Sequence, residues 1–195
     1  MEERINQLPI YTIGYGNRSI DECMRLLHYY VIEFLVDIRS QPYSRFHPDY
    51  SKAALESRLK REGLRYIFFG DTLGGRPADA TCYINGKVDY AILREKLFYQ
   101  QGITRLASAR DKHARIVLLC SEQKPEECHR SKLIGNSLHA KGIEVAHIDE
   151  SGQLKSQAEV DRVLTGGQLS LFDDPALNPK TGLSRKKYTP EGYPK

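Results

Sequence analysis

Two cysteines and a histidine stand close together in the segment LLCSEQKPEECHRS. A thiolate is a strong nucleophile, and an imidazole can act as its general base or carry its proton. Cys128 precedes a helical pattern and Arg130, and both features would lower the pKa of its thiol. We therefore predict Cys128 and His129 as catalytic residues, with Glu122 as a candidate acid and Cys120 as a second thiol.

Other interpretations of these residues stay open. Cys120 can be a buried thiol at a strand end, Cys128 a packed helix residue and Glu122 a surface charge. A phosphatase signature needs an arginine six positions after the cysteine, where Cys120 is followed by Glu126. Zinc or an iron–sulfur cluster would need a CxxC pair or an obvious fourth ligand. The sequence has neither, so it predicts no metal site.

Polar residues also follow the other apolar runs of the chain. Asp37 precedes Arg39, and its carboxylate can act as a general base, hold the arginine in place, or form an internal ion pair with it. Arginines in such loops would suit a polyanionic ligand. The predicted ligand-binding residues are Tyr15, Asn17, Arg18, Arg39, Arg45, Gly70 and Arg130.

Aromatic residues are interleaved with these arginines. Tyr15, Tyr43 and Phe46 can stack on a base or a sugar, or they can form a hydrophobic plug under the loops. Gly70 allows the backbone to approach a ligand closely. With the arginines, the stacking interpretation predicts a phosphate-bearing ligand, a nucleotide or a stretch of DNA backbone.

Five short apolar runs alternate with helical patterns and define the elements that must position these residues. The predicted strands are 10–15, 34–38, 64–69, 116–119 and 144–148. This order predicts an α/β fold with three layers, a mostly parallel five-stranded sheet and helices on both faces, which is Rossmann-like. Ligands of such sheets bind beyond the carboxyl ends of the strands, where the loops above meet.

The segments between and after the strands carry their own signals. Helical patterns cover 89–110 with a pause at Gly102, and a weaker one covers 154–164. Asn85-Gly86 predicts a hairpin turn. Residues 173–195 are rich in Pro, Gly and Lys, so we expect them to lack independent structure. We therefore divide the chain into an α/β domain (1–150) and a helix with a tail (151–195).

The composition excludes several classes of protein. Hydrophobic residues are 40% and charged residues 28% of 195, as in globular proteins, and no apolar run is long enough for a membrane span. The N-terminal residues lack the layout of a secretory signal, and the four cysteines are sparse, so we expect a cytoplasmic protein. A net charge of +4 is compatible with a nucleic-acid partner.

Four motifs resemble a bacterial and archaeal family known as domain of unknown function 488. They are TIGYGNRS, VDIRSQPYSRF, FFGDTLGGR and LLCSEQKPEECHRS, and the resemblance covers about residues 10–150. It implies a single α/β domain. It implies no particular activity and no cofactor, so the chemistry rests on the residues themselves.

The tail contains the apolar pentapeptide QLSLF after a Gly-Gly pair. It resembles the motif by which bacterial replication and repair proteins bind the sliding clamp. The resemblance implies that Gln168 binds a polar subsite, that Leu171 and Phe172 fill an apolar pocket, and that Leu169 supports the extended backbone. The pentapeptide can also dock on its own domain.

Together these features predict a cytoplasmic protein of DNA repair or DNA metabolism. It would bind a nucleotide or DNA at the sheet edge and a sliding clamp through its tail, without a membrane. A thiol-dependent small-molecule enzyme, similar to a sulfurtransferase or a phosphatase, is the alternative. A non-catalytic adaptor that recognises a nucleotide is the third possibility.

Overall fold

The computed structural model describes residues 8–166 and 182–188. Its main sheet has six strands in the order β3-β2-β6-β1-β7-β8. The strands are β1 (Ile10–Gly14), β2 (Phe34–Asp37), β3 (Arg65–Phe68), β6 (Ile116–Cys120), β7 (Val145–Ile148) and β8 (Leu154–Ser156). All neighbours are parallel except β7 and β8, which are antiparallel. The prediction of an α/β fold with a mostly parallel sheet is confirmed.

Helices and turns connect the strands. The α-helices are α1 (Ile20–Tyr29), α2 (Lys52–Arg61), α3 (Tyr90–Arg94), α4 (Leu97–Asp111), α5 (Asn136–His139) and α6 (Gln157–Thr165). Three 3-10 turns are η1 (Pro48–Tyr50), η2 (Ala80–Cys82) and η3 (Pro125–Glu127). A short π-helix, η4 (Arg130–Gly135), leads directly into α5.

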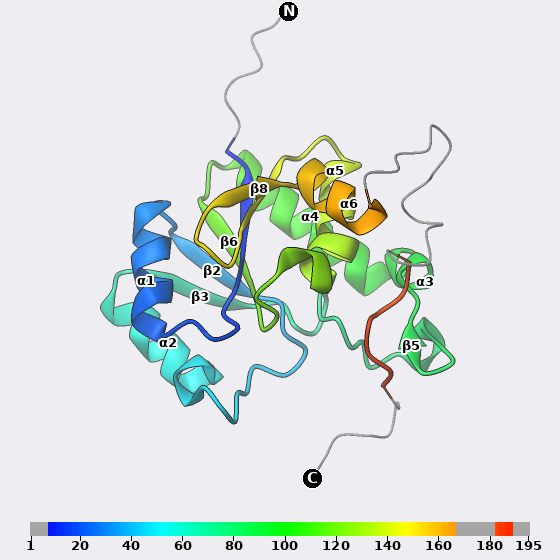
Figure 1. Cartoon of the computed structure of the whole chain (residues 1–195), viewed down its shortest axis with the longest axis horizontal. Helices are drawn as coiled ribbons and strands as arrows, with labels where there is room; N and C mark the ends of the chain where they lie inside the picture. The colour runs from blue at the N-terminus through cyan, green and yellow to red at the C-terminus, as the bar shows by residue number, and fades with distance from the viewer. Residues whose placement is uncertain (1–7, 167–181, 189–195) are drawn as a thin grey trace, which may run out of the picture.

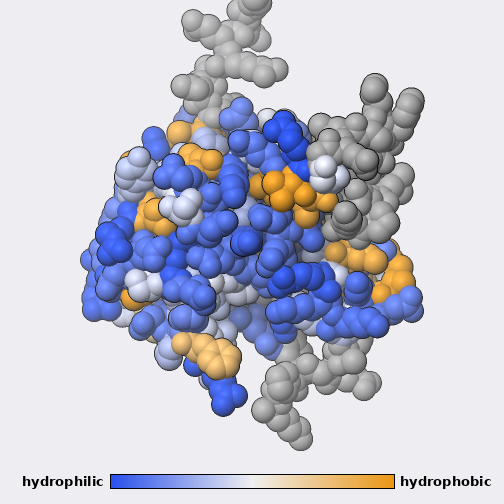
Figure 2. Space-filling view, in the orientation of Figure 1, coloured by the Kyte–Doolittle hydropathy of each residue, from blue (hydrophilic) through white to orange (hydrophobic). Residues whose placement is uncertain are grey.

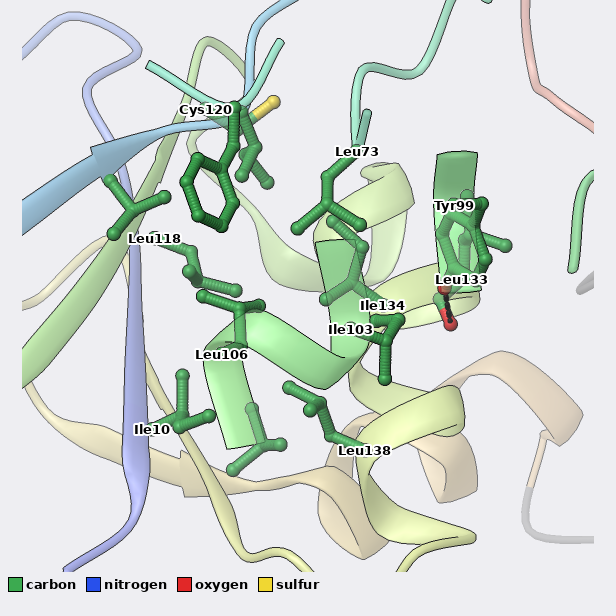
Figure 3. Packing of buried hydrophobic residues seen from close by; sticks show 14 of the residues in the cluster. Ile10, Leu73, Tyr99, Ile103, Leu106, Leu118, Cys120, Leu133, Ile134 and Leu138 are labelled. Carbon is green, nitrogen blue, oxygen red and sulfur yellow. Dashed lines mark hydrogen bonds between the residues drawn. The ribbon is translucent and has the colours of Figure 1, made fainter. Parts of the chain in front are cut away.

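The sheet separates two hydrophobic clusters, because successive side chains of a strand point to opposite faces. On β6, Val117 and Leu119 pack with α1 and α2, whereas Leu118 and Cys120 pack with α3, α4 and η4. Figure 1 shows α1 and α2 on one side of the sheet and α4 and α5 on the other. In Figure 3 the sulfur of Cys120 lies at the margin of the cluster that packs with α3, α4 and η4.

The connections after β1 and β6 leave the sheet towards opposite faces. The chain after β1 enters α1, whereas the chain after β6 enters η4, which packs in the other cluster. These two strands are neighbours, so a crevice opens between their departing loops. In open α/β sheets, this topology favours the carboxyl ends of β1, β2 and β6 as the location of a binding site.

The sheet has six strands, so the prediction of five was wrong. Residues 154–156 form β8, although their pattern predicted the start of a helix. That helix, α6, begins only after Ser156, whose side chain accepts a hydrogen bond from the Glu159 N–H while Glu159 bonds back to Ser156. The folded unit thus continues past residue 150.

Gly102 does not interrupt a helix. It lies inside α4, where a Cβ atom would collide with the side chain of Leu73. The break in the helical pattern comes earlier, between α3 and α4. Gly102 therefore allows α4 to pack closely, which a helix-propensity argument cannot detect.

A small hairpin forms at Asn85-Gly86, as predicted. Both residues have positive φ, as a type I′ turn requires, and they join β4 (Tyr83–Ile84) to β5 (Lys87–Val88). Residues 182–188 lie along this hairpin: Ser184 exchanges hydrogen bonds with Val88, and the N–H of Tyr188 donates to the carbonyl of Gly86. This part of the tail is therefore held by its contacts with the domain.

The molecular surface is mostly hydrophilic on the face shown in Figure 2, where the hydrophobic patches are separate from one another. Within the residues that the structure describes, no helix is long and apolar enough to cross a membrane.

Candidate functional site

Four side chains that can ligate or transfer protons meet at the end of β6. They are Cys120, Glu122, Cys128 and His129, and their donor atoms all lie within 4.8 Å of one another. Both thiols contact the same Glu122 oxygen, with Sγ–Oε2 distances of 3.1 Å for Cys120 and 3.4 Å for Cys128. The Nδ1 atom of His129 lies 3.6 Å from the first sulfur and 3.7 Å from the second. The predicted catalytic residues of this loop are thus adjacent.

The loop between Cys120 and Cys128 is held in its turn by internal hydrogen bonds. The N–H of Cys128 donates to the carbonyl of Pro125 over 3.0 Å, and the Ser131 hydroxyl donates to the same carbonyl. The Arg130 guanidinium donates to the carbonyls of Glu122 and Gln123. The cluster is therefore preformed by the fold of its own loop.

Gly14 explains how this loop approaches β1 so closely. A Cβ atom at Gly14 would collide with the carbonyl of Glu122 and with the guanidinium of Arg130. Only glycine leaves room at this position, so the glycine of the segment TIGYG has a packing role at the base of the site.

Two of the four arginines predicted to bind an anion, Arg18 and Arg130, do not line the pocket described below. Arg130 is fully buried and donates to the two carbonyls above. Arg18 is also buried and donates to the carbonyls of Gly14 and Asp149. Buried guanidinium groups need acceptors, and main-chain carbonyls supply them here. The expectation that Arg18 and Arg130 hold an anion is therefore not met.

The segment after Cys128, where a helix N-terminus was predicted, is the short π-helix η4, and its first N–H groups are already hydrogen-bonded. The Cys128 carbonyl accepts from the N–H groups of Ser131 and Lys132, and the N–H of Arg130 points to the Cys128 sulfur at 3.4 Å. The first amides of η4 are thus used within the loop. One of them points to the sulfur of Cys128 and two donate to its carbonyl, so these three amides do not form a binding site for a ligand.

Arg39 and Asp37 form a buried ion pair, one of the interpretations that the sequence left open. The guanidinium binds both carboxylate oxygens, at 2.9 and 2.6 Å, and Tyr66 donates to the same carboxylate. Burial opposes the charge of Arg39, but the bond to Asp37 outweighs it and raises the pKa of the guanidinium. Asp37 therefore acts on Arg39 and does not line the pocket.

The remaining predicted ligand-binding residues have different surroundings. Tyr15 is buried, stacks on Tyr50 with a ring distance of 4.2 Å and lies next to the Arg39 guanidinium. Arg45 and Asn17 are exposed and lie outside the pocket. Gly70 packs against the carbonyl of Arg39, so its role is structural. Of this group, Tyr15 and Arg39 reach the site.

A pocket of about 200 Å³ opens above the cysteine cluster. Cys120, Glu122 and His129 line it, whereas Cys128 lies behind them and is 1% exposed. Its cationic lining residues are Arg39, Arg76, Arg185 and Lys186, and its tyrosines are Tyr15, Tyr43, Tyr90 and Tyr188. Phe46 is 85% exposed and lies outside the pocket.

The sequence analysis missed several of these lining residues. Arg76 is the last residue of the segment FFGDTLGGR and could have been noticed there. Ser184, Arg185, Lys186 and Tyr188 come from residues 182–188, which no local pattern connects to the site. They reach it because this segment pairs with the hairpin of β4 and β5.

The groups of the cluster shift one another's pKa values. Burial raises the pKa of the Cys120 thiol well above its usual range, and the adjacent Cys128 sulfur adds to this. Burial acts on Cys128 in the same direction, but the hydrogen bond from Cys120 and the His129 imidazole lower its pKa to about 5. Burial also opposes ionisation of Glu122, yet His129 and Cys120 lower its pKa to about 2.

The pKa of the His129 imidazole is shifted as well. Burial opposes the charge of His129, but the neighbouring Cys128 and Glu122 outweigh it and raise its pKa. The site therefore favours an imidazolium between a thiolate and a carboxylate, with Cys120 as the protonated thiol. Such a set can donate and accept protons.

The predicted clamp-binding residues Gln168, Leu169, Leu171 and Phe172 lie outside the described residues. The helix before them, α6, ends at Thr165 and is followed by Gly166, which adopts the left-handed conformation of a helix C-cap.

Comparison with curated proteins and with solved structures gives no match. The family model described as domain of unknown function DUF488 matches residues 19–136, which are more than half of the chain. The matched range includes the cluster residues and the loops after β2 and β3. The chain therefore belongs to the DUF488 family.

Proposed function

We propose that this protein binds a phosphate-bearing ligand, a nucleotide or a segment of DNA, in the pocket above the cysteine cluster. The observation that carries the proposal is the pocket lining, where four cationic side chains and four tyrosines surround groups that can transfer protons. Cations suit phosphate oxygens, and aromatic rings suit bases and sugars.

The cationic side chains of the pocket differ in how far their existing contacts leave them available to bind a phosphate. Arg39 is fixed by Asp37, but its Nη1 atom is buried and has no hydrogen-bond partner among the described residues. Arg76 lies over the ring of Tyr188 at 4.3 Å, and Arg185 pairs with Glu127 at 2.8 Å. Arg39 can therefore orient a phosphate at the base, while Arg76 and Arg185 bind at the exposed mouth.

The proton-transfer groups lie at the floor of the same pocket. Glu122 and His129 are within hydrogen-bond reach of a ligand there, and the Cys120 sulfur is on the wall. We assign Glu122 and His129 to general acid–base work, and Arg39 to holding the anion. Cys128, which lies behind them, adjusts the charge of His129.

A comparison of ligands tests this assignment. The full chain should bind ADP and a short single-stranded oligonucleotide, and adenosine should bind much more weakly because it lacks phosphate. The variant Arg76→Ala/Arg185→Ala should bind ADP at least about tenfold more weakly, since it loses two charged contacts. Arg25→Ala/Arg61→Ala, with exposed arginines on α1 and α2, is the matched control.

Two results of that titration would overturn the proposal. One is equal affinity for adenosine and ADP, which would mean that no phosphate is recognised. The other is an unchanged affinity for ADP when Arg76 and Arg185 are removed together.

The proposal includes work on DNA because of the QLSLF pentapeptide, which resembles a sliding-clamp ligand. The full chain should bind a purified bacterial sliding clamp in calorimetry, and Leu171→Ala/Phe172→Ala should abolish that binding. Leu154→Ala, at an exposed position of β8, is the control. Clamp binding that survives the double substitution, or none by the unaltered chain, would remove the DNA assignment.

A thiol-dependent small-molecule enzyme is the second candidate, because the Cys120 sulfur lines the pocket and lies next to Glu122 and His129. This candidate predicts an activity that Cys120→Ser abolishes and that needs no oligonucleotide. Unchanged ADP binding by Cys120→Ser would separate it from the phosphate-binding function.

A further inference from the structure

We infer that Cys120, Glu122, Cys128 and His129 form a tetrahedral binding site for a divalent transition-metal ion, with zinc as the best match. The inference concerns the protein itself and does not depend on which ligand enters the pocket. With the ion bound, Glu122 and His129 are metal ligands, so the general acid–base role proposed above belongs to the metal-free protein. It replaces the sequence-based prediction of no metal, which found no fourth ligand.

The distances between the donor atoms fit this geometry. With bonds of about 2.3 Å to sulfur and about 2.0 Å to nitrogen or oxygen, a tetrahedral ion separates a sulfur from a lighter donor by about 3.5 Å. The four sulfur-to-lighter-atom distances here are 3.1, 3.4, 3.6 and 3.7 Å. One ion can therefore reach all four donors after only small shifts.

The charges of the cluster also call for a cation. Two thiols and a carboxylate are gathered in a largely buried space, with one imidazole among them. The nearest guanidinium, that of Arg130, is directed to main-chain carbonyls. Buried anionic groups are costly unless they are paired or bound to a metal. Without a metal, the His129 imidazolium offsets only one of the two negative charges. A divalent ion would displace its proton and that of Cys120, and would neutralise both resulting thiolates.

The surroundings resemble the outer shell of a metal centre. The N–H of Arg130 points to the Cys128 sulfur at 3.4 Å, and the Ser121 hydroxyl donates to the Glu122 carboxylate at 3.1 Å. Gly75 packs against the His129 ring so closely that a Cβ atom would meet Nδ1 at 2.8 Å. Such contacts fix the orientation of ligands before the metal binds.

The donor set selects among metals. Two thiolates and an imidazole favour zinc over calcium or magnesium, which bind oxygen ligands. The spacing explains why the site is hidden in the sequence, because the ligands come from a strand end, the loop after it and the Cys-His pair that follows η3. Glu122, the single oxygen donor, lies on the pocket side, so a ligand oxygen could take its place.

Cobalt(II) substitution tests the site directly. The reduced full chain, without nucleotide, should bind one equivalent of cobalt(II) and develop the intense visible bands of a tetrahedral ion together with thiolate charge-transfer absorption. Zinc should displace it with the same stoichiometry, measured by elemental analysis. Failure of ADP binding would leave this result unaffected, so the two proposals can be judged separately.

Substitutions of single cysteine and glutamate residues test which side chains bind the metal ion. Cys120→Ser and Cys128→Ser should each lose most of the thiolate charge-transfer absorption and most of the zinc, while circular dichroism confirms that they fold. Cys82→Ala removes a buried thiol outside the cluster and should keep full stoichiometry. Glu122→Gln should keep the charge-transfer absorption and change the visible bands.

Three outcomes would overturn the inference. A folded, reduced chain that takes up neither cobalt nor zinc excludes the site. So does the same loss of metal in Cys82→Ala as in Cys128→Ser. The third is a mass lower by two hydrogens in the purified chain with no metal bound, which would show that Cys120 and Cys128 form a disulfide instead.

Discussion

His147 is a buried histidine that the sequence analysis did not single out. It lies on β7 between Thr12 and Gln157, with Nδ1 at 2.7 Å from the Thr12 hydroxyl and Nε2 at 2.8 Å from the Gln157 amide oxygen. The Gln157 amide nitrogen donates to Asn136 and Asp161, which fixes the amide so that its oxygen accepts from Nε2. Nε2 therefore carries a proton, and in the neutral imidazole Nδ1 can accept from the Thr12 hydroxyl.

This histidine should make the free energy of unfolding depend on pH. Burial lowers the pKa of His147 to about 3, and the Arg130 charge contributes, whereas an unfolded histidine titrates near 6.5. Between these values the unfolded chain binds the extra proton, so stability is full above about pH 6.5 and falls as the pH decreases. We expect a loss of about 1.4 kcal/mol per pH unit from this group.

Urea denaturation of the native chain and of His147→Gln between pH 7 and pH 4 measures that loss. The variant cannot titrate at this position, so the difference in stability between the two proteins should shrink as the pH falls. A difference that stays constant over this range would contradict the assignment.

Side-chain direction limits what a sequence can predict at the level of single residues. Arg18, Arg39 and Arg130 follow strand ends as expected, but two of them donate to carbonyls and the third pairs with Asp37. A sequence indicates which residues lie near an edge of the sheet. It does not indicate which acceptor a guanidinium will choose, because main-chain carbonyls are present everywhere.

The segment 182–188 is an element that forms part of the pocket and depends on few contacts. Ser184 holds it: its hydroxyl accepts from the N–H of Val88 and donates to the carbonyl of Lys186, each at 2.9 Å. In Ser184→Ala the buried Val88 N–H loses its acceptor, which costs about 1–2 kcal/mol. The segment should then detach roughly tenfold more often.

Limited trypsin digestion measures this detachment, because Arg185 and the two lysines after it are cleavage sites in the segment. Ser184→Ala should be cut there about tenfold faster than the native chain, with little change in the melting temperature. Ser156→Ala, which removes the cap of α6 at a distance from the pocket, should leave this cleavage rate unchanged. Equal rates for the native chain and Ser184→Ala would show that the segment is not held by these bonds.

Local patterns predicted the central elements of the fold and failed at its margins. Four of the parallel strands, β1, β2, β6 and β7, are largely buried apolar runs, so hydrophobicity identifies them. The pattern of β3 also predicts a strand, although its residues are only partly buried. β8 is short and partly exposed, and its side chains carry no such signal. Residues 182–188 are ordered by pairing with β5, a contact between positions far apart in sequence, which no window of residues can reveal.

The arrangement of the whole molecule explains why the sequence indicated the edge of the sheet where the candidate site lies but did not indicate the complete lining of its pocket. Parallel strands with crossovers on both faces place the loops after β1, β2 and β6 at one edge, and the sequence alone implied this edge. The lining from residues 182–188 follows from the complete fold, as does the contact of Glu122 with both thiols. The sequence therefore placed the four cluster residues near one edge of the sheet, where the structure brings them together, and it did not point to the cationic residues of the pocket mouth.

The charge distribution of the whole molecule leads to a last prediction, on the salt dependence of DNA binding. The chain carries a net charge of +4, and Arg76, Arg185 and Lys186 form an exposed cationic mouth at the pocket. Each phosphate contact on a single strand contributes about 0.7 to the slope of log affinity against log salt. If all three cations contact phosphates, the slope for a single-stranded oligonucleotide should be about −2.

Fluorescence anisotropy over a series of salt concentrations measures this slope. Arg185→Ala should reduce its magnitude by about 0.7, since one contact is lost, whereas Arg61→Ala, at an exposed position of α2 outside the pocket, should leave it unchanged. The affinity at low salt should fall in the first variant and not in the second. A slope that Arg185→Ala leaves unchanged would mean that the strand passes elsewhere on the protein, and the cationic residues of 182–188 would then have no part in binding it.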